Sequence, residues 1–358
     1  MARTTGTVRI VGTGLLGTSV GLGLTPQGVD VVLDDASPSA LALAFDYGAG
    51  RHARADDDVA LVVVAVPPDR TAAVVAAELA AHPRALVTDV ASVKGPILDE
   101  LAATETDTAR YIGSHPMAGR ERSGPIAARA DLFVGRPWVL SAHADGRAGA
   151  AEVVEALALD LGAVPVHLAA DRHDAAVAVV SHAPQLVASL LAARLIDASY
   201  ETVGLVGQGM RDVTRIAGSE PAMWVQILRA NAAHVAPVLT DLRDDLDAVL
   251  QALDAPDAAG SPRALADALA AGNSGVARIP GKHGVDLKLT GLTVLIDDTP
   301  GQLARLLTEI GDLGVNLEDL RLEHSPGAPI GIVEVQVAPE AASPLVDDLT
   351  RLGWRVAG

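Results

Sequence analysis

The sequence predicts an α/β protein in three parts: an α/β domain with a mostly parallel sheet, an all-helical domain, and a small second α/β domain. Three observations support this division. A chain of 358 residues is too long for a single hydrophobic core. Strand patterns alternate with helical ones up to about Leu168 and then disappear. They return only after a stretch rich in Gly, Pro, Asp and Ser.

Short β-branched runs, separated by segments rich in alanine and leucine, mark the first part. Continuous apolar strands that alternate with helices favour a mostly parallel sheet covered on both faces. The strands are expected at Val8–Val11, Val29–Asp34, Leu61–Val66, Ala85–Asp89, Tyr111–Gly113, Trp138–Ser141 and Ala163–His167. We place this first domain at residues 1–169.

The second part, from about residue 170, lacks strand patterns. Apolar residues recur at helical spacing over Asp171–Leu195, Ser219–Val235 and Pro237–Leu253. Helices with long apolar faces tend to dimerise, so we expect an all-helical, homodimeric domain at residues 170–278. The composition of Ala255–Lys288 predicts a linker with one short helix at Pro262–Ala271.

The third part has the order strand, helix, strand, strand, helix, strand, which is the βαββαβ pattern of a ferredoxin-like domain. We place it at residues 286–358. Its elements are expected at Leu287–Asp297, Pro300–Leu313, Val315–Glu323, Gly331–Val337, Pro339–Leu352 and Trp354–Val356, with a turn at 325–329. Pro300 is predicted to be the first residue of its helix, behind the capping candidates Asp298 and Thr299.

Composition and charge exclude several classes of partner. The chain is 49% apolar and 20% charged, which is the balance of a folded protein. Its 27 basic and 45 acidic residues give a net charge of −18. A field of that sign repels phosphate backbones and anionic lipid, and aromatics at 2% leave little for stacking on bases. We therefore expect neither nucleic acid nor a membrane as a partner.

The chain has no cysteine, which excludes disulfide scaffolds, thiolate nucleophiles and Cys-ligated zinc. Its purely apolar stretches, such as Ala60–Val66, are far shorter than a membrane span. From Met1 the chain runs almost directly into a strand, with no apolar signal segment. These observations predict a cytoplasmic protein, and we expect no metal site.

A GxGxxG pattern lies between the first predicted strand and the helix after it. Its residues are Gly12, Thr13, Gly14, Leu15, Leu16 and Gly17. Such glycines permit a tight turn, close approach of a pyrophosphate and close helix–strand packing. The next strand ends in Asp34, twenty residues past Gly14, where a carboxylate can accept hydrogen bonds from a ribose 2′-hydroxyl. With Asp35 beside it to repel a 2′-phosphate, the pattern predicts NAD rather than NADP as the cofactor.

Two side chains follow strands of the same sheet, at the strand ends that face a ligand crevice. His115 comes after the strand at Tyr111–Gly113, and it either satisfies loop backbone or takes part in chemistry. Lys94, one of three lysines in the chain, follows the strand at Ala85–Asp89. Position favours a function for His115, while a solvated loop charge remains open for Lys94.

The helical part holds further candidates. Ser181 and His182 lie inside an apolar helix, where a polar pair is more often a packing detail than a ligand contact. Arg215 stands before Ile216 and Ala217, near a helix start. It is either a surface cation or a partly buried clamp, because a guanidinium can hold a carboxylate through two hydrogen bonds.

Taken together, five segments resemble the prephenate/arogenate dehydrogenase family of tyrosine biosynthesis. They are the glycine loop, Asp89…Ser92-Val93-Lys94, Ser114-His115-Pro116-Met117-Ala118-Gly119, Ser181-His182-Ala183-Pro184, and Asp212-Val213-Thr214-Arg215-Ile216-Ala217…Met223-Trp224. The resemblance covers residues from about 8 to 235 and implies a Rossmann domain followed by a helical dimerisation domain. The last region resembles an ACT domain, a regulatory amino-acid-binding module, in the segment Asp298-Thr299-Pro300-Gly301-Gln302-Leu303 after its first strand.

The resemblance implies an oxidative decarboxylation. A hydride leaves C4 of a cyclohexadienol ring for the nicotinamide, the C4 hydroxyl loses its proton, and the ring carboxylate departs as CO₂. Because aromatisation drives this reaction, the protein has to align the reactants and handle one proton. We take prephenate as the substrate and arogenate, which carries an amino group in place of the side-chain keto group, as the alternative.

The same resemblance implies roles for three residues that are far apart in the chain. His115 would be the base that accepts a hydrogen bond from the C4 hydroxyl. Ser92 would bond His115 or the same hydroxyl and so hold the useful tautomer. Arg215 would bind the ring carboxylate, and its contribution should appear mainly in substrate affinity, because that carboxylate is lost during the reaction.

Four more residues complete the implied substrate site. His182 and Ser219 would line it, and Trp224 would reach it from the partner subunit. The family often has a small hydroxyl residue directly after the HPMAG segment, where this chain has Arg120. That cation either binds the side-chain carboxylate of the substrate or points to solvent.

Two alternatives remain. The β-hydroxyacid dehydrogenases also join a Rossmann domain to a helical one, but they use a lysine of the second domain, and residues 171–253 contain none. A non-catalytic sensor of nucleotide and amino acid is the other alternative. If the chain is an enzyme, we expect L-tyrosine or another aromatic amino acid to inhibit it through residues near Asn316.

Overall fold

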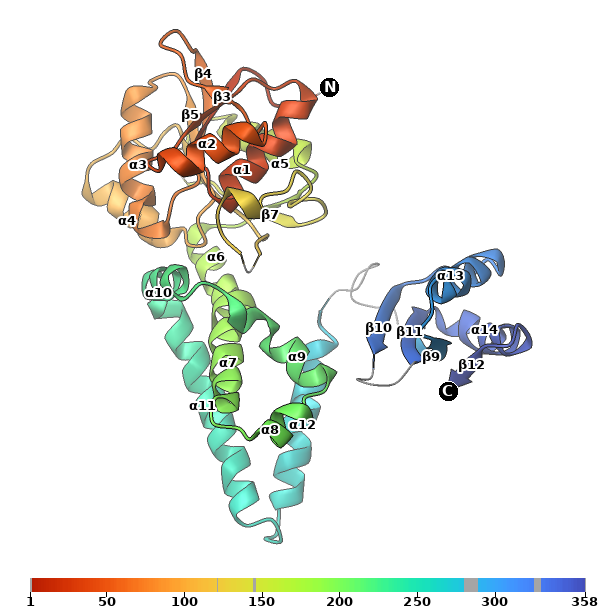
Figure 1. Ribbon diagram of the computed structural model, residues 1–358. Coiled ribbons are helices and arrows are strands. Elements are labelled where there is room, and N and C mark those ends of the chain that lie inside the picture. The colour runs from red at the N-terminus through yellow and green to blue at the C-terminus, as the bar shows by residue number, and fades with distance from the viewer. Residues whose placement is uncertain (1, 121, 144–145, 280–288, 325–329, 358) are drawn as a thin grey trace. The chain divides into compact units, whose positions relative to one another are not determined.

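The computed structural model describes residues 2–120, 122–143, 146–279, 289–324 and 330–357. It divides into two compact units, Met1–Arg243 and Asp244–Gly358 (Figure 1). The first unit contains the N-terminal sheet and most of the helical region. The second contains the end of the helical region and a small C-terminal sheet.

The N-terminal sheet has eight strands in the order β3-β2-β1-β4-β5-β6-β7-β8. The strands are β1 (Thr7–Val11), β2 (Val31–Asp34), β3 (Arg51–His52), β4 (Val59–Val64), β5 (Leu86–Asp89), β6 (Tyr111–Pro116), β7 (Pro137–Ser141) and β8 (Val164–His167). All neighbours are parallel except β6 and β7, which are antiparallel. The predicted mostly parallel sheet is confirmed, and the two-residue strand β3 was not predicted. The strand order reverses between β1 and β4, a switch point where such sheets bind ligands.

Helices cover both faces of this sheet (Figure 1). Buried residues of α1 (Leu15–Leu24), α2 (Pro38–Asp46) and α5 (Ala150–Asp160) form one core cluster with side chains from the strands. Those of α3 (Pro68–Ala81) and α4 (Gly95–Ala103) form the other. The central strands are buried on both faces, which explains why their sequences are continuously apolar rather than alternating.

The helical region follows as α6 (Ala170–Val177), a π-helical turn (Ala178–His182), α7 (Ala183–Ala192), α8 (Tyr200–Gly204), α9 (Gln208–Thr214), a 3₁₀ turn (Arg215–Gly218), α10 (Pro221–Ala230) and α11 (Ala232–Asp254). The prediction of helices without strands is confirmed over this stretch. The predicted break between Val235 and Pro237 is wrong. The chain breaks at Asn231, whose side chain is buried and hydrogen-bonded, and α11 continues through Pro237.

By length and composition, the helical stretch Ala170–Leu195 could cross a membrane, with a mean hydropathy of 1.6 over its best window. Its polar side chains point to another role. His173, Asp174 and His182 are each about 1% exposed or less and are hydrogen-bonded to other parts of the first unit. This pattern is typical of an internal helix that carries a polar site.

In the second unit, the short helix predicted at Pro262–Ala271 is present but longer, since Ser261–Val276 forms the sixteen-residue helix α12. Residues 280–288 of the predicted linker lie outside the described residues. The C-terminal sheet has the antiparallel order β10-β11-β9-β12. Its elements are β9 (Thr290–Asp297), α13 (Gln302–Asp312), β10 (Asp319–His324), β11 (Ile330–Val337), α14 (Pro339–Arg351) and β12 (Arg355–Ala357). The predicted βαββαβ order is therefore present.

Alternate residues of β9 and β11 form a core with α13 and α14, including Val294, Val333, Leu306 and Leu349. The predicted cap of the first helix is wrong. The helix begins at Gln302 and its N-cap is Gly301, with a φ of 90° that only glycine adopts readily. The predicted turn at 325–329 lies outside the described residues.

Candidate active site

The glycine loop joins β1 to α1 at the switch point of the sheet, and its three glycines differ in what surrounds them. Gly12 has a φ of 101°, and a side chain there would overlap the backbone of Ala65. A side chain at Gly17 would overlap the carbonyl of Gly12. At Gly14, the N-cap of α1, a side chain would meet nothing within 4 Å, and no side chain caps the helix. The loop therefore leaves open space beside a helix N-terminus, which suits a pyrophosphate.

Two carboxylates follow β2, and they have different partners. Asp34 accepts a 2.6 Å hydrogen bond from Nη2 of Arg9, whose guanidinium also binds Glu78. Asp35 turns to the glycine loop, where its Oδ2 accepts hydrogen bonds from the backbone N (2.5 Å) and Oγ1 (2.8 Å) of Thr13. The sequence singled out Asp34 as the ribose ligand, but Asp35 is the carboxylate that contacts the loop.

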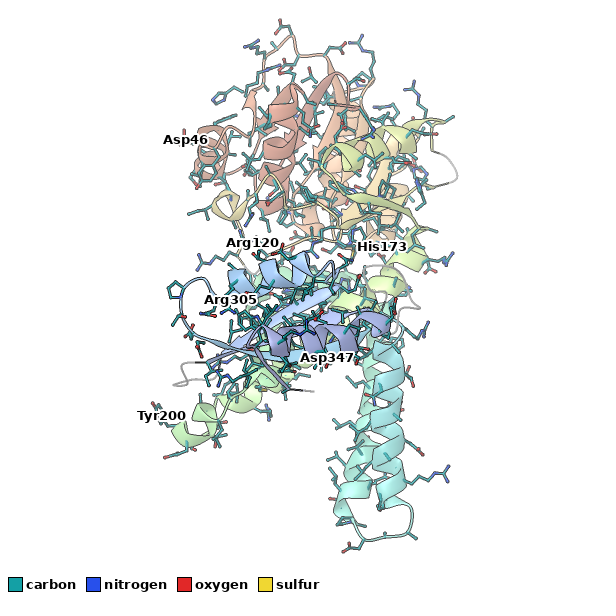
Figure 2. All side chains as sticks on the ribbon, turned by 90° about the vertical axis from the view of Figure 1, so that its right-hand side faces the viewer. Asp46, Arg120, His173, Tyr200, Arg305 and Asp347 are labelled. Carbon is teal, nitrogen blue, oxygen red and sulfur yellow. The ribbon has the colours of Figure 1, made fainter. Side chains whose placement is uncertain are left out.

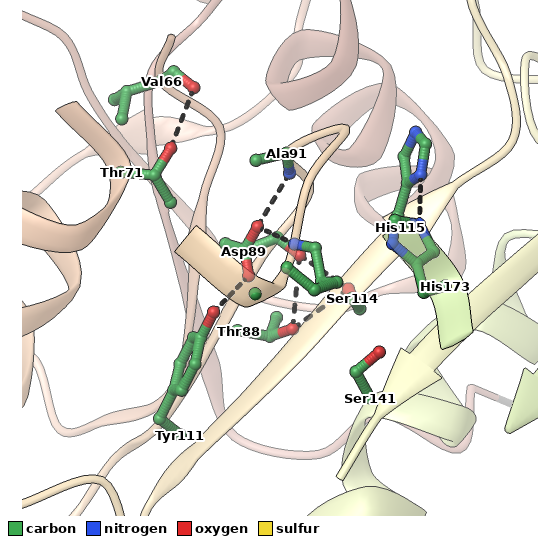
Figure 3. A network of polar contacts seen from close by, with 12 residues as sticks. Val66, Thr71, Thr88, Asp89, Ala91, Tyr111, Ser114, His115, Ser141 and His173 are labelled. Atoms are coloured by element: carbon green, nitrogen blue, oxygen red, sulfur yellow. Dashed lines mark hydrogen bonds and ion pairs between the residues drawn. The ribbon is translucent and has the colours of Figure 1, made fainter. Parts of the chain in front are cut away.

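Lys94 is 1% exposed, so its interpretation as a solvated loop charge is wrong. Its Nζ donates to Oδ1 of Asp89 at the end of β5, and burial lowers its pKa although Asp89 opposes that shift. Asp89 also accepts hydrogen bonds from the Tyr111 hydroxyl (2.6 Å) and the backbone N of Ala91 (2.8 Å), as Figure 3 shows. This cluster fixes the loop between β5 and α4 in which half-buried Ser92 lies.

His115 is the last residue but one of β6, paired with the antiparallel strand β7, and is 8% exposed. Its predicted place in a loop after the strand is wrong, because pairing with β7 extends β6 beyond His115. Nδ1 of His115 is 2.9 Å from Nε2 of His173, which lies with Asp174 in α6 (Figure 3). The rings meet edge to face at 79°. Burial lowers the pKa of His115 well below its usual value, and His173, Lys94 and His182 shift it in the same direction. The imidazole is therefore neutral at pH 7.

Asp174 joins this histidine pair to the N-terminus of α4. Its Oδ1 is 2.7 Å from Nδ1 of His173 and accepts a 2.9 Å bond from the backbone N of Lys94. Its Oδ2 accepts a 2.8 Å bond from the backbone N of Gly95. Burial opposes ionisation of Asp174, but the bonds from His173 and from both backbone groups outweigh it and lower its pKa. The carboxylate is therefore charged, and it anchors the helical region to the sheet.

His182 ends the π-helical turn, a feature that often marks functional sites. The ring is 1% exposed, and its Nδ1 is 2.9 Å from Nδ2 of Asn231. Burial lowers its pKa to about 4, with His173 adding to that shift and Asp174 opposing it. Trp224 packs edge-on against this ring within the same chain, whereas the resemblance placed it across a subunit interface. In the single chain described, the Trp224 indole Nε1 is buried without a hydrogen-bond partner.

Arg215 begins the 3₁₀ turn after α9, and its side chain is exposed. The turn is tied to α7 one helical turn past His182, since Gln185 Nε2 donates to the carbonyl of Ile216 at 3.0 Å. The Ser219 hydroxyl donates to the same carbonyl at 2.8 Å. The structure thus brings the segment of Arg215 and Ser219 to the helix that carries His182.

Arg120 lies in the long loop after β6, and its side chain is exposed. Its Nη1 donates to the carbonyl of Ala127 in the same loop at 3.2 Å. No described hydrogen bond connects it to the histidine cluster. Among the described residues, no group of three or more His, Asp or Glu side chains is arranged to hold a metal ion.

Sequence reasoning missed His173, Asp174 and Asn231. The first two were visible as polar residues at the start of an apolar helix, nine and eight positions before His182. Asn231 lay inside a predicted helix and gave no signal. The three residues come together only in the folded chain, where Asn231, just before α11, contacts α6. Its Nδ2 donates to the carbonyl of Asp174 at 2.8 Å.

Known proteins resemble this chain in sequence and in fold. A family model described as the prephenate dehydrogenase nucleotide-binding domain matches residues 20–167, and one described as the prephenate dehydrogenase dimerization domain matches residues 169–266. A Streptomyces niveus protein, "Probable prephenate dehydrogenase NovF", is 38% identical over 356 residues, which are 97% of this chain and 98% of that protein. The prephenate dehydrogenase of Bacillus subtilis is 29% identical over 70% of this chain and 71% of its own length.

Among solved structures, the prephenate dehydrogenase of A. aeolicus in complex with hydroxyphenyl propionate and NAD+ matches with a TM-score of 0.67 at 25% identity. The match covers 77% of this chain and 100% of that one. The two family models together span well over half of the chain, and the Streptomyces relative covers nearly all of it. The chain belongs to the prephenate dehydrogenase family.

Proposed function

We propose that the protein is an NAD-dependent prephenate dehydrogenase of tyrosine biosynthesis. It converts prephenate to 4-hydroxyphenylpyruvate and CO₂, and arogenate is the alternative substrate. The observation that carries this proposal is the neutral, buried imidazole of His115, held at a strand end of a sheet with a dinucleotide-type glycine loop. Such an imidazole can accept a proton at pH 7.

The residues around the glycine loop fit NAD. The open space at Gly14 would accommodate the pyrophosphate at the N-terminus of α1. Asp34 and Asp35 would bind the adenosine ribose, with Asp35 already held against Thr13, and together they repel the extra phosphate of NADP. Bound NAD supplies the acceptor for the hydride that leaves C4 of the substrate.

The proton chemistry belongs to His115. It accepts a hydrogen bond from the C4 hydroxyl as the C4–H bond breaks, and the electrons of the departing carboxylate complete the aromatic ring. The reaction releases no net proton, because the proton that His115 draws from the hydroxyl returns to the phenolic oxygen. Positioned base catalysis of this kind contributes ~10²–10⁴ in rate. Ser92, in the loop fixed by Asp89, would bond the same hydroxyl.

Residues of the helical region and of the loop after β6 would bind the substrate. Arg215, an exposed residue beside the helix of His182, would bind the ring carboxylate through its guanidinium. His182 and Ser219 would line the site, and the buried Nε1 of Trp224 would donate a hydrogen bond there. Arg120 would bind the side-chain carboxylate.

The first two proposed domains, at residues 1–169 and 170–278, would work as a cytoplasmic homodimer. Helices of the first unit expose large apolar side chains that a second copy would cover. Each of the following is more than half exposed: Val179, Val180, Leu190, Ile196 and Leu205. Figure 2 shows Tyr200, 91% exposed, on the same helical region. Light scattering should give twice the monomer mass.

The βαββαβ unit at residues 286–358 would be an ACT-like regulatory domain that binds an aromatic amino acid. Asn316, whose Nδ2 donates to Glu318 in the segment before β10, would lie near the effector. L-tyrosine should inhibit the full-length protein, and the Asn316→Ala variant should need more of it. Equal inhibition of both proteins would remove Asn316 from the effector site.

Initial rates of NADH formation test the main proposal. The protein should reduce NAD with prephenate, more slowly with arogenate, and poorly with NADP in place of NAD. Faster turnover of arogenate would make that compound the substrate. No absorbance change with either compound would favour a non-catalytic sensor of nucleotide and amino acid.

A further inference from the structure

We propose that His173 and Asp174 are positioning residues that hold His115 in one tautomer, with the proton on Nδ1 and the lone pair on Nε2. The inference rests on the proposed role of His115 as the base. It goes beyond that role, because the bond expected to hold the tautomer was one to Ser92, whereas Nδ1 of His115 lies 2.9 Å from His173.

The ionised carboxylate of Asp174 determines which atom donates in each of these hydrogen bonds. It can only accept hydrogen bonds. It accepts from the backbone N of Lys94 and from that of Gly95, so its position is fixed by the N-terminus of α4. The nitrogen of His173 that faces it at 2.7 Å, Nδ1, must therefore carry a proton.

A neutral imidazole has one donor and one acceptor nitrogen. When it carries a single proton, held on Nδ1 by Asp174, His173 presents the lone pair of Nε2 to its neighbour. Nδ1 of His115, 2.9 Å away, must then be the donor. The proton of His115 is thereby placed on Nδ1, and Nε2 remains the one ring nitrogen able to take a proton from substrate.

The backbone of Asp174 sets the opposite tautomer in the second buried histidine. Its carbonyl accepts from Nδ2 of Asn231, which fixes the orientation of that amide, since a carbonyl cannot donate. The other hydrogen of Nδ2 points to Nδ1 of His182 at 2.9 Å, so that nitrogen is the acceptor. The proton of His182 is therefore on Nε2. The site offers a proton acceptor on His115 and a donor on His182.

Burial of His173 and Asp174 protects the hydrogen bonds that set the tautomer of His115. His173 is fully buried and Asp174 is 1% exposed, so water cannot easily replace either bond. The groups with ionisable side chains that face His115 are His173, Lys94 and His182, with Asp174 behind His173. Among them, Asp174 supplies the negative charge that stabilises an imidazolium at His115 through the His173 ring.

Nitrogen NMR on the ¹⁵N-histidine-labelled protein, without substrate, tests the inference directly. The signals of His115 are assigned by their loss in the His115→Gln variant. We expect the wild type to show a protonated Nδ1 and an unprotonated Nε2 at His115. A proton on Nε2 instead would overturn the proposal. Because this readout needs no turnover, it separates the tautomer from the proposed reaction.

Kinetics of two variants at His173 provide the second test. His173→Phe keeps the ring volume but removes the acceptor, so kcat should fall about 10²-fold while the KM for prephenate changes less than about threefold. His173→Gln, whose side-chain oxygen can accept from Nδ1 of His115, should recover a large part of that loss. The control is His167→Phe, at an exposed ring in β8 that is bonded to Glu155.

The results of these experiments distinguish a positioning role of His173 from a purely structural one. Equal losses in the Phe and Gln variants, or a loss confined to KM, would contradict a positioning role. If His173→Phe does not fold, the wild-type NMR signals and the Gln variant still decide the question. If the wild type lacks prephenate activity but shows the expected tautomer, the proposed function fails and the bond directions stand.

Discussion

The glycine loop and the histidine cluster both lie at strand ends of the same sheet, but they are built differently. The loop is one continuous segment from Gly12 to Gly17, and its local surroundings exclude a side chain at Gly12 and at Gly17 but not at Gly14. The cluster joins β6, the start of α4, the α6–α7 stretch and the residue before α11 through hydrogen bonds. A local motif can be predicted from spacing, whereas a cluster of this kind exists only after the chain has folded.

The largest effect is expected in the cluster. The His115→Asn variant replaces the proposed proton acceptor with a smaller, neutral polar side chain that is no base, so kcat should fall by ~10²–10⁴ while the dissociation constant for NAD stays unchanged. Rate measurements and NAD titration of the same preparations check this. His167→Asn, at an exposed histidine, is the control. Turnover near that of the wild type would remove His115 from the mechanism.

In the loop, Gly14→Ala and Gly12→Ala form a matched pair. Gly14 has open space beside it, so its variant should melt like the wild type but bind NAD ~10–10²-fold more weakly, because the new methyl group would occupy the proposed place of the pyrophosphate. Gly12→Ala should lower the melting temperature, since its φ and the backbone of Ala65 both exclude a side chain. Unchanged NAD affinity in Gly14→Ala would place the cofactor elsewhere.

Arg215 resembles the glycine loop in lying on a short local turn, and the histidine cluster in depending on a contact between distant segments. Gln185 bonds that turn to the helix of His182. Arg215→Ala should raise the KM for prephenate about tenfold or more and lower kcat much less, since the carboxylate it would hold is lost in the reaction. Steady-state kinetics measure the split, and Arg211→Ala, in the preceding helix, is the comparison. The reverse pattern, a large fall in kcat at constant KM, would contradict the carboxylate assignment.

The last prediction concerns how the free energy of unfolding depends on pH through His182. Burial lowers the pKa of His182 to about 4, below the usual value of 6.5. Above pH 6.5 the ring is neutral in both folded and unfolded chains. Below it the unfolded chain takes up the proton first, so the free energy of unfolding should fall towards pH 4, by up to ~1.4 kcal/mol per unit for this group. Denaturant titrations should show a shallower fall in His182→Gln; identical slopes would contradict the buried, neutral ring.

Much of the fold followed from the sequence, because the strands of the first sheet are continuous apolar runs and the βαββαβ pattern alternates clearly. The wrong predictions are at positions where contacts between distant segments override the local sequence preference. Asn231, bonded to Asp174, breaks a helix that the apolar spacing continued. Lys94 was open to a solvent-exposed interpretation until the fold placed Asp89 against it. Gly301 caps a helix that Pro300 was expected to begin.

The site shows the same limit. His115 was indicated by its place after a strand, and His182 by the resemblance of its segment to a known family. Their partners His173, Asp174 and Asn231 were not indicated, since nothing in the spacing of residues 115, 174 and 231 predicts that their segments meet. Hydrogen-bond direction, which decides what each imidazole can do, depends on those partners.

A crystal structure of the protein with NAD and 4-hydroxyphenylpyruvate bound tests the central claim most directly. The account predicts the phenolic oxygen of the product within about 2.6–3.2 Å of Nε2 of His115, with Nδ1 of that ring still on His173. A product bound with its hydroxyl directed away from His115, or towards Nδ1 of a flipped ring, would contradict it.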